Sequence, residues 1–231
     1  MISIIIPTYQ HGDIIEKCLD SIYQQTYQKF EVIVVNDGSR DNTIPVLENY
    51  PKPLTIINQE NQGANKARNN GFAKSQGEYV IFCDADLILK GTMLEKMLKA
   101  LKENPDKAYA YSAFKWGFKT FKLWPFDSEK LKKMNYIHTT SLIRRETFPG
   151  FDENIKRLQD WDLWLAMLEQ NHKGAYIPEV LFQVHPRKTG MSEWIPSLAY
   201  KIPFAKLGIK MKKVEKYKKA EKIIKKKHSL L

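Results

Sequence analysis

Short apolar segments that alternate with helix-like stretches constrain the fold of this chain most strongly. Between the segments, apolar residues at helical spacing predict helices near residues 13–23, 43–50 and 64–75. The segments themselves are rich in β-branched residues and are predicted to be buried strands: ISIII (2–6), FEVIVVND (30–37), LTIIN (54–58) and YVIFCD (79–84). Strands that alternate with helices predict an α/β fold with an open, mostly parallel sheet and right-handed crossovers.

Polar residues follow three of these strands at the point where each strand ends. The clusters are Pro7-Thr8-Tyr9, Asn36-Asp37-Gly38-Ser39 and Asp84-Ala85-Asp86. If the strands are parallel, their carboxyl ends meet at one edge of the sheet, which is where open α/β sheets bind ligands. The sequence therefore predicts a polar ligand site at this edge.

Asp84 and Asp86 are unusual because they end a strand that is otherwise apolar. Two carboxylates this close repel each other, and a divalent cation would relieve that repulsion. Mg²⁺ and Mn²⁺ prefer oxygen ligands and commonly bind one or two carboxylates together with substrate phosphates. The alternative is a solvated turn, in which aspartate is an ordinary residue.

The rest of the chain is less regular. A helix at 92–102 and a strand at 108–113 continue the pattern, but residues 114–136 interleave aromatic residues with lysines and have no clear period. A further helix is expected near 160–170, followed by a strand-like segment, GAYIPEVLFQVHP, at 174–186. With 231 residues, of which 43% are hydrophobic, the chain suits one α/β domain with an appendage.

Five motifs occur in one order along the first 190 residues: PTY (7–9), VVNDGSRDNT (34–43), NQGANKARNNGFAKSQGEYVIFCDAD (61–86), FPGFDENI (148–155) and LQDWDLWLAM (158–167). In these motifs the chain resembles the family 2 glycosyltransferases of GT-A fold. The resemblance implies a metal-dependent, inverting transfer of a sugar from a nucleotide-diphosphate donor, a UDP-sugar, to a hydroxyl acceptor in polysaccharide or glycolipid synthesis. It also implies a nucleotide-sugar-binding half at 1–113 and an acceptor half that carries the base at 114–192. The composition of the remaining residues predicts a basic helical tail at 193–231.

The resemblance assigns the nucleotide-binding residues one by one. Pro7, Thr8 and Tyr9 would line the nucleoside pocket, and Asp37 would accept a hydrogen bond from the uracil imide. Thymine offers the same imide, so a thymidine nucleotide stays an alternative. Arg68 would lie near the base or the diphosphate. Asn36 departs from the aspartate that is more common at its position. Taken alone, Tyr9 could be a packing residue, Asp37 could cap the turn that follows it, and Arg68 could be a surface residue of its helix.

The same resemblance assigns the metal ligands. Asp84 would bind the ribose or the metal, and Asp86 would bind the Mn²⁺ or Mg²⁺ ion that bridges the diphosphate. His185, at the end of a strand-like segment, would lie near the metal or the diphosphate, with Arg187 and Lys188 close to the phosphates.

Inverting transfer needs a carboxylate that takes the proton of the acceptor hydroxyl. The resemblance places this base at Asp160 in RLQDWDLW, where Gln159 replaces the usual glutamate. Asp162 is the other candidate, and Asp160 could instead be only a helix N-cap. His138 is a further candidate for the acceptor side.

Two other functions fit an α/β fold with a metal site. A nucleotidyltransferase would need a Gly-rich phosphate loop near the first strand, and PTYQHGD at 7–13 does not supply one. A non-catalytic protein that binds a nucleotide or a glycan would not need Asp37, Asp84, Asp86 and Asp160 together. Both stay as alternatives to the transferase.

The basic character of the chain belongs to its tail. Residues 201–231 hold 12 lysines and two glutamates, which accounts for +10 of the net charge of +11. Leu207, Met211, Val214, Tyr217 and Ile224 would lie near one face of an amphipathic helix. This helix could pack on its own domain, insert its apolar face into an anionic membrane, or mediate oligomerisation. Nucleic-acid binding is disfavoured because the tail has almost no arginine and few aromatic residues.

The two cysteines, Cys18 and Cys83, fall in a helix-like and a strand-like pattern, so we expect reduced, buried thiols. The N-terminus lacks the features of a signal peptide, and no window is apolar enough to span a bilayer. We expect a cytoplasmic protein, peripheral on the inner face of the cell membrane if the tail binds lipid.

Overall fold

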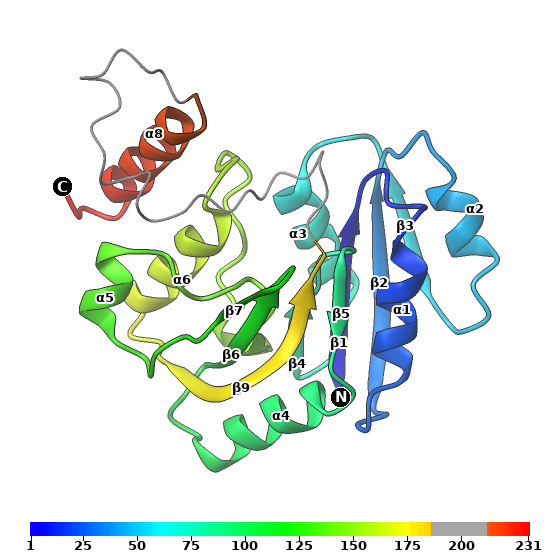
Figure 1. Cartoon of the computed structure of the whole chain (residues 1–231), viewed down its shortest axis with the longest axis horizontal. Coiled ribbons are helices and arrows are strands. Elements are labelled where there is room, and N and C mark those ends of the chain that lie inside the picture. Colours follow the sequence, from blue (N-terminus) through cyan, green and yellow to red (C-terminus); the bar gives the residue numbers. More distant parts are fainter. Residues whose placement is uncertain (186–211) are drawn as a thin grey trace.

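The structure, a computed structural model, describes residues 1–185 and 212–231 (Figure 1). In this part of the chain the strands form one mixed sheet in the order β3-β2-β1-β4-β8-β6-β9-β5, with β7 beside β6. The strands are β1 (Ile2–Thr8), β2 (Phe30–Asp37), β3 (Thr55–Gln59), β4 (Tyr79–Phe82), β5 (Leu87–Leu89), β6 (Tyr109–Trp116), β7 (Lys119–Phe121), β8 (Leu142–Arg144) and β9 (Gly174–Val184). The helices are α1 (Ile15–Tyr23), α2 (Thr43–Glu48), α3 (Ala64–Lys74), α4 (Met93–Glu103), α5 (Ser128–Lys133), α6 (Gln159–Glu169) and α8 (Lys212–Lys227), with a 3₁₀ turn at Arg145–Thr147.

The N-terminal half is the parallel sheet that the sequence predicts. β1 pairs in parallel with β2 and β4, and β2 pairs in parallel with β3. α3 packs against β1 and β2, and this approach requires a glycine at position 71. A Cβ atom on Gly71 would lie 2.5 Å from Ile5 Cγ2 and 3.0 Å from Val35 Cγ2. The helix that carries Arg68 is therefore held close to the sheet.

The second half adds antiparallel strands that the alternating pattern does not reveal. β8 runs antiparallel to β4 and β6, β5 runs antiparallel to β9, and β6 pairs with β9 in parallel. The irregular stretch at 114–136 consists of the end of β6, the short hairpin to β7, and α5. Gly117 turns this hairpin at φ 54°, and Asp127 caps α5 by accepting a hydrogen bond from the Lys130 N–H at 2.9 Å. Elements as short as β7 and α5 contain too few residues to show a repeating pattern of apolar positions.

The larger of two hydrophobic clusters joins the two halves of the chain. It contains the apolar residues of β1 and β4 together with Tyr109, Trp161 and Trp164, all of which are fully buried. The indole N–H groups of Trp161 and Trp164 donate to the carbonyl oxygens of Leu131 (2.6 Å) and Ile137 (2.9 Å). The division of the chain into two halves at residue 113 remains a prediction. The core is continuous across this position.

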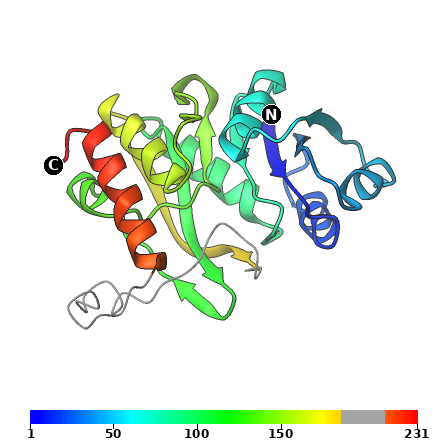
Figure 2. The ribbon, with the colours of Figure 1, turned by 90° about the horizontal axis from the view of Figure 1, so that it is seen from above.

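The C-terminal helix α8 packs on its own domain. Val214, Ala220 and Ile224 are buried, and Figures 1 and 2 both place α8 beside α6. This is the first of the arrangements that the sequence left open for the tail. Leu207 and Met211 lie outside the described residues. Among the helices that the structure describes, none is long and apolar enough to cross a membrane.

Candidate active site

The polar ends of the strands meet at one edge of the sheet, as the sequence predicts. Thr8 on β1 pairs with Asn36 on β2, and Asp37 pairs with Gln59 on β3. β4 lies on the other side of β1, with Phe82 opposite Ile5, so that Asp84 follows at the same edge. Four parallel strands therefore deliver their polar residues to a common site.

Asp37 is buried, and it organises the loop that precedes α3. Its Oδ1 accepts hydrogen bonds from the Gln59 side chain and the Gln62 backbone N–H, and its Oδ2 accepts one from the Gly63 N–H, all at 2.8 Å. Gly63 has φ 95°, a conformation that glycine adopts without strain. A carboxylate offers about four acceptor positions, so one remains for a ligand. The contact with uracil stays a prediction. The alternative was that Asp37 caps the turn that follows it, but its carboxylate instead accepts hydrogen bonds from residues 59–63.

The segment after β1 presents an aromatic ring to the solvent. Pro7 and Thr8 are buried, and the Thr8 hydroxyl lies 3.1 Å from His11 Nδ1. The Tyr9 side chain is 42% exposed at the same edge, so it is not a core packing residue. A ring in this position can stack on a nucleobase.

Arg68 is buried on α3 and binds Asp84. Its Nη2 lies 2.8 Å from Asp84 Oδ1, and its Nη1 reaches the side-chain oxygens of Asn65 (3.2 Å) and Gln159 (3.4 Å). The alternative of a surface helix residue is therefore wrong. Burial alone would raise the pKa of Asp84, but the Arg68 guanidinium outweighs it, so that the pKa lies below its ordinary value.

The residues assigned to the metal lie side by side. The His185 backbone N–H donates to the Asp86 carbonyl oxygen at 2.9 Å, which joins the end of β9 to the Asp84-Ala85-Asp86 segment. Within residues 1–185 and 212–231, no group of three or more His, Cys, Asp or Glu side chains is arranged to hold a metal ion by itself. Two partly exposed carboxylates fit a hard cation that takes its other ligands from a diphosphate and water. Arg187 and Lys188 lie outside the described residues.

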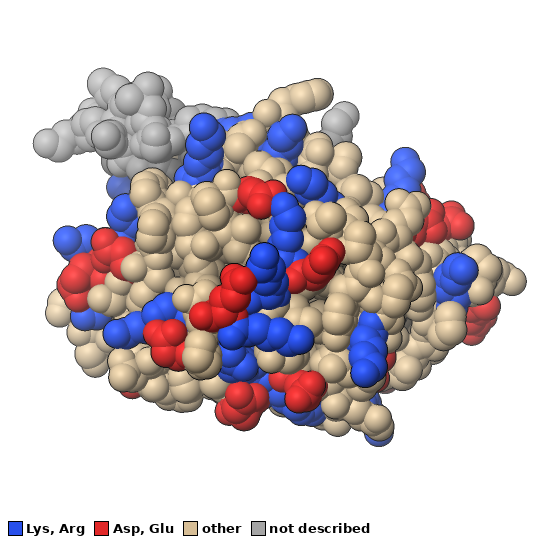
Figure 3. Space-filling view, turned by 90° about the horizontal axis from the view of Figure 1, so that it is seen from below, with Lys and Arg blue, Asp and Glu red and all other residues tan. Residues whose placement is uncertain are grey.

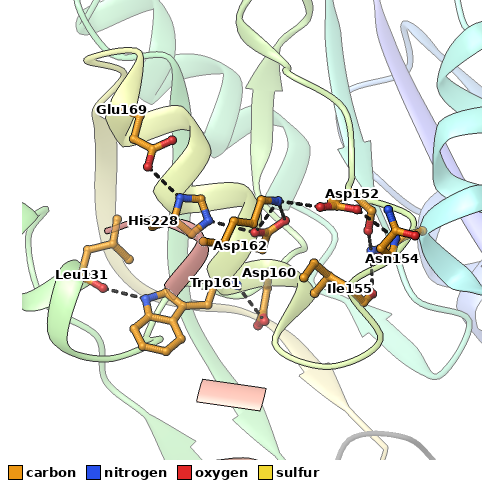
Figure 4. A network of polar contacts seen from close by, with 11 residues as sticks. Leu131, Asp152, Asn154, Ile155, Asp160, Trp161, Asp162, Glu169 and His228 are labelled. Carbon is orange, nitrogen blue, oxygen red and sulfur yellow. Dashed lines mark hydrogen bonds and ion pairs between the residues drawn. The ribbon is translucent and has the colours of Figure 1, made fainter. Parts of the chain in front are cut away.

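The two carboxylates at the start of α6 differ in their surroundings. Asp160 is half-buried, and its Oδ1 accepts a hydrogen bond from the Trp161 N–H at 3.0 Å. It is the second residue of the helix, and the N-cap is Leu158, so Asp160 is not the cap. Asp162 is buried and bound to Lys227 and His228 (Figure 4). Because Asp162 is already paired with cations, the geometry favours Asp160 as the base.

His138 was singled out only weakly by its sequence context, yet the charges of both candidate carboxylates, Asp84 and Asp160, act on its ring. The ring packs against Phe114 and Phe182, which stack on each other, and its Nδ1 accepts a hydrogen bond from the Thr140 N–H at 3.0 Å. Burial lowers the pKa of His138 below its ordinary value, although Asp84 and Asp160 act in the opposite direction. The ring is therefore neutral at pH 7, with its proton on Nε2. No local motif around residue 138 reveals this placement, because strand order alone brings it to the site.

Asparagines of α3 hold the loop that leads to α6. The Asn65 side chain donates to the carbonyl oxygens of Asp152 (2.7 Å) and Ile155 (3.1 Å). Asn69 donates to the Phe151 carbonyl and accepts from the Phe151 N–H, both at 2.9 Å. The NQGANKARNN and FPGFDENI motifs therefore form one interface, which sets the position of Asp160 relative to Arg68.

Residues 3–157 match the sequence model of "Glycosyl transferase family 2", which covers the sheet edge, Arg68 and both aspartates of the 84–86 segment. The chain belongs to this family. An uncharacterised glycosyltransferase of Haemophilus influenzae is 30% identical over 186 residues, which is 74% of this chain and 63% of that protein. A Bacillus subtilis protein described as a putative teichuronic acid biosynthesis glycosyltransferase, TuaG, is 31% identical over 204 residues, 78% of this chain and 77% of that protein.

Solved structures of glycosyltransferases share the fold. The Staphylococcus aureus TarS fragment 1–349 in complex with UDP-GlcNAc superposes with a TM-score of 0.71 at 21% identity, over 87% of this chain and 63% of that one. The mannosyltransferase PcManGT of Pyrobaculum calidifontis, in complex with GDP-Man and Mn²⁺, superposes with a TM-score of 0.69 at 23% identity. The match covers 82% of this chain and 58% of that one. These similarities confirm the predicted GT-A type of α/β fold. The chain spans about one third to two thirds of the length of several curated relatives that it matches.

Proposed function

We propose that the chain is a metal-dependent, inverting glycosyltransferase that moves a sugar from a nucleotide-diphosphate donor, a UDP-sugar, to a hydroxyl acceptor. One observation carries the proposal. Asp84, bound by Arg68 just after β4, and Asp160, at the start of α6, lie close enough to one site that the charges of both act on His138. A donor group on the sheet edge and a base on the facing helix are the two parts that this reaction needs.

On the donor side, Tyr9 would stack on the base, and the remaining acceptor position of Asp37 would receive the imide N–H. Asp84, through the oxygen that Arg68 does not bind, and Asp86 would hold a divalent cation, with His185 beside them. Bound there, the cation would offset the negative charge that develops on the leaving diphosphate. Arg68 keeps Asp84 ionised for this task.

On the acceptor side, Asp160 would remove the proton of the attacking hydroxyl. The acceptor oxygen forms a bond to the anomeric carbon as the bond from that carbon to the diphosphate oxygen breaks. The diphosphate leaves with the bonding electron pair, and the proton stays on Asp160. A single in-line displacement inverts the configuration at the anomeric carbon. Neutral His138, with its proton on Nε2, can donate a hydrogen bond to the sugar or the acceptor.

The acceptor that we propose is a glycan or a lipid-linked glycan, reached at an anionic membrane surface through α8. Lys218, Lys222 and Lys226 lie at intervals of four residues and are exposed, so they form one basic face. The face of the molecule in Figure 3 instead intersperses lysine and arginine with acidic side chains. Because Val214, Ala220 and Ile224 pack on the domain, docking would rest on lysine charge and not on apolar insertion.

A thermal-shift panel tests the proposal. Purified chain is mixed with UDP-, dTDP- and GDP-sugars, with and without Mn²⁺, because a ligand that binds only the folded state raises its stability. We expect a Mn²⁺-dependent rise in melting temperature with a UDP-sugar, which Asp86→Ala abolishes. Asp106→Asn, on the opposite edge of the sheet, should respond like the wild type. No shift with any sugar nucleotide would overturn the proposal.

A further inference from the structure

The last turn of α8 places two cationic side chains on the helix that carries the candidate base. Lys227 Nζ lies 2.8 Å from Asp162 Oδ1 and 2.9 Å from Oδ2, and His228 Nε2 lies 2.8 Å from Oδ1. The side chains of Asp162 and His228 are only 5% and 3% exposed (Figure 4). A buried carboxylate is costly unless it is paired, so α8 supplies the cations that Asp162 needs.

Lys227 also reaches the loop in front of α6. Its Nζ lies 2.8 Å from Asp152 Oδ2, while the other carboxylate oxygen of Asp152 accepts from the Asn154 N–H at 2.9 Å. The backbone of Asp152 is bound by Asn65 of α3. Lys227 therefore links the loop at residues 151–155 to the first turn of α6, and α3 holds the same loop through Asn65.

His228 bridges two carboxylates of α6. Its Nδ1 lies 2.8 Å from Glu169 Oε1, and its Nε2 lies 2.8 Å from Asp162 Oδ1. A neutral imidazole has one N–H, so both contacts are hydrogen bonds only when the ring is protonated. Burial opposes that state, but Asp162 and Glu169 outweigh it and raise the pKa of His228. Lys227, His228, Asp152, Asp162 and Glu169 are called the α8 clasp below.

The first turn of α6 has no side-chain cap of its own. Its N-cap is Leu158, in a left-handed conformation with φ 57° and without a capping hydrogen bond. Asp160 and Asp162 share this turn. A first turn without a cap frays readily unless other contacts hold it.

We propose that Lys227 and His228 are positioning residues for Asp160. By binding Asp162, they hold the first turn of α6 against the 151–155 loop and fix the Asp160 carboxylate opposite Arg68 and Asp84. The role of Asp160 as a base rests on the proposed function. That α8 holds the first turn of α6 in place does not depend on it. The competing explanation is that the apolar contacts of Val214, Ala220 and Ile224 dock α8 and the clasp adds nothing to α6.

Hydrogen exchange of the full-length chain separates the two explanations. The variants are Lys227→Met, His228→Gln and the two combined, and Lys226→Met removes a neighbouring exposed charge outside the clasp as the matched control. Lys227→Arg keeps a cation that can bind both carboxylates. We expect the amides of residues 161–164 to exchange about tenfold faster in the double variant, with Lys226→Met and Lys227→Arg close to the wild type. Equal exchange in the double variant and the wild type would overturn the proposal.

Steady-state kinetics provide a second test. The release of UDP from the UDP-sugar that stabilises the chain is measured for the same variants. We expect kcat to fall by about tenfold or more in the double variant with the donor KM within about twofold, because the donor half is untouched. A rise in KM with unchanged kcat would contradict a role in positioning the base. If the wild type releases no UDP from any donor, the proposed function fails, and the exchange experiment still decides whether α8 holds α6.

Discussion

At the scale of single residues, two pairs of aspartates show how the surroundings divide the work between identical side chains. Asp84 and Asp86 are one residue apart, as are Asp160 and Asp162. Arg68 binds Asp84, and Lys227 and His228 bind Asp162. Within the described residues no ion pair involves Asp160, which leaves its carboxylate available for a proton.

The first prediction concerns the base. Asp160→Asn should reduce kcat by about 10²–10⁴-fold, the usual size of a general-base contribution, because an amide cannot take the hydroxyl proton. Asparagine has nearly the same shape, so the Mn²⁺-dependent binding of the donor should stay within about twofold. The measurements are steady-state UDP release and donor titration. Asp106→Asn is the control, and undiminished turnover in Asp160→Asn would remove the residue from the mechanism.

The second prediction concerns Arg68, whose guanidinium reaches Asp84, Asn65 and Gln159 from a buried position. Lysine keeps the charge but has one nitrogen, so Arg68→Lys leaves buried acceptors without donors. We expect a loss of ~1–3 kcal/mol of stability, seen in the melting temperature, together with weaker donor binding. Arg40→Lys, at an exposed position, should leave the melting temperature unchanged. Equal melting of the wild type and Arg68→Lys would show that lysine fills the role.

At the scale of elements, local pattern predicts those parts of the fold in which one period governs many residues. β1, β2, β3 and β4 occur where their β-branched runs predict them, and the parallel pairing that joins their polar ends follows from the helices between them. β7 and α5 are too short for a period. Strand order brings His138, from before β8, to the site, and no property of its own neighbours in sequence encodes that order.

α8 marks a second limit of prediction from sequence. Its lysines and apolar residues fit a membrane surface, a partner protein or its own domain equally well. An amphipathic pattern predicts which face of a helix is buried, but it does not predict what covers that face. The residues that decide the matter, Lys227 and His228, are ordinary in the sequence. Their partners Asp152 and Asp162 lie more than 60 positions away in the chain. Likewise, only the position of α8 shows that Asp162 is paired with cations, which is the reason that Asp160 is the proposed base.

The third prediction is a pH dependence of the attachment of α8. The pKa of His228 is raised in the folded chain, so its contribution to stability is fully present below the unfolded pKa of about 6.5 and is lost as pH rises through the folded value. Asp162, Glu169 and the Lys227 cation face the ring. The melting temperature of the wild type should therefore exceed that of His228→Gln most at pH 6, and less at pH 9.

His172→Gln, on the loop after α6 and outside the clasp, is the matched control for this experiment. Its melting temperature should follow that of the wild type over the same pH range. A gap between the wild type and His228→Gln that stays constant or widens with pH would contradict a cationic His228.

At the scale of the whole molecule, most of the net charge and the contact with the proposed base's helix belong to the same tail. Residues 201–231 carry +10 of the net charge of +11, and the last turn of α8 contacts α6. The inner face of α8 packs on the domain, while its outer face displays lysines to the solvent. Deletion of the tail would disturb both proposed roles of α8 together, so only substitutions on the outer face can test surface binding alone.

The last prediction separates these faces. Lys218→Glu, Lys222→Glu and Lys226→Glu combined should abolish flotation with vesicles that contain phosphatidylserine, because each surface lysine contributes about 1 kcal/mol near an anionic membrane. Flotation of the wild type should also fall in 0.5 M NaCl, where the Debye length is below about 8 Å. Lys227 and His228 remain in the triple variant, so its melting temperature and UDP release in solution should match the wild type. Equal flotation of the two proteins would exclude α8 as the docking surface, and an acceptor in solution would then be the simpler choice.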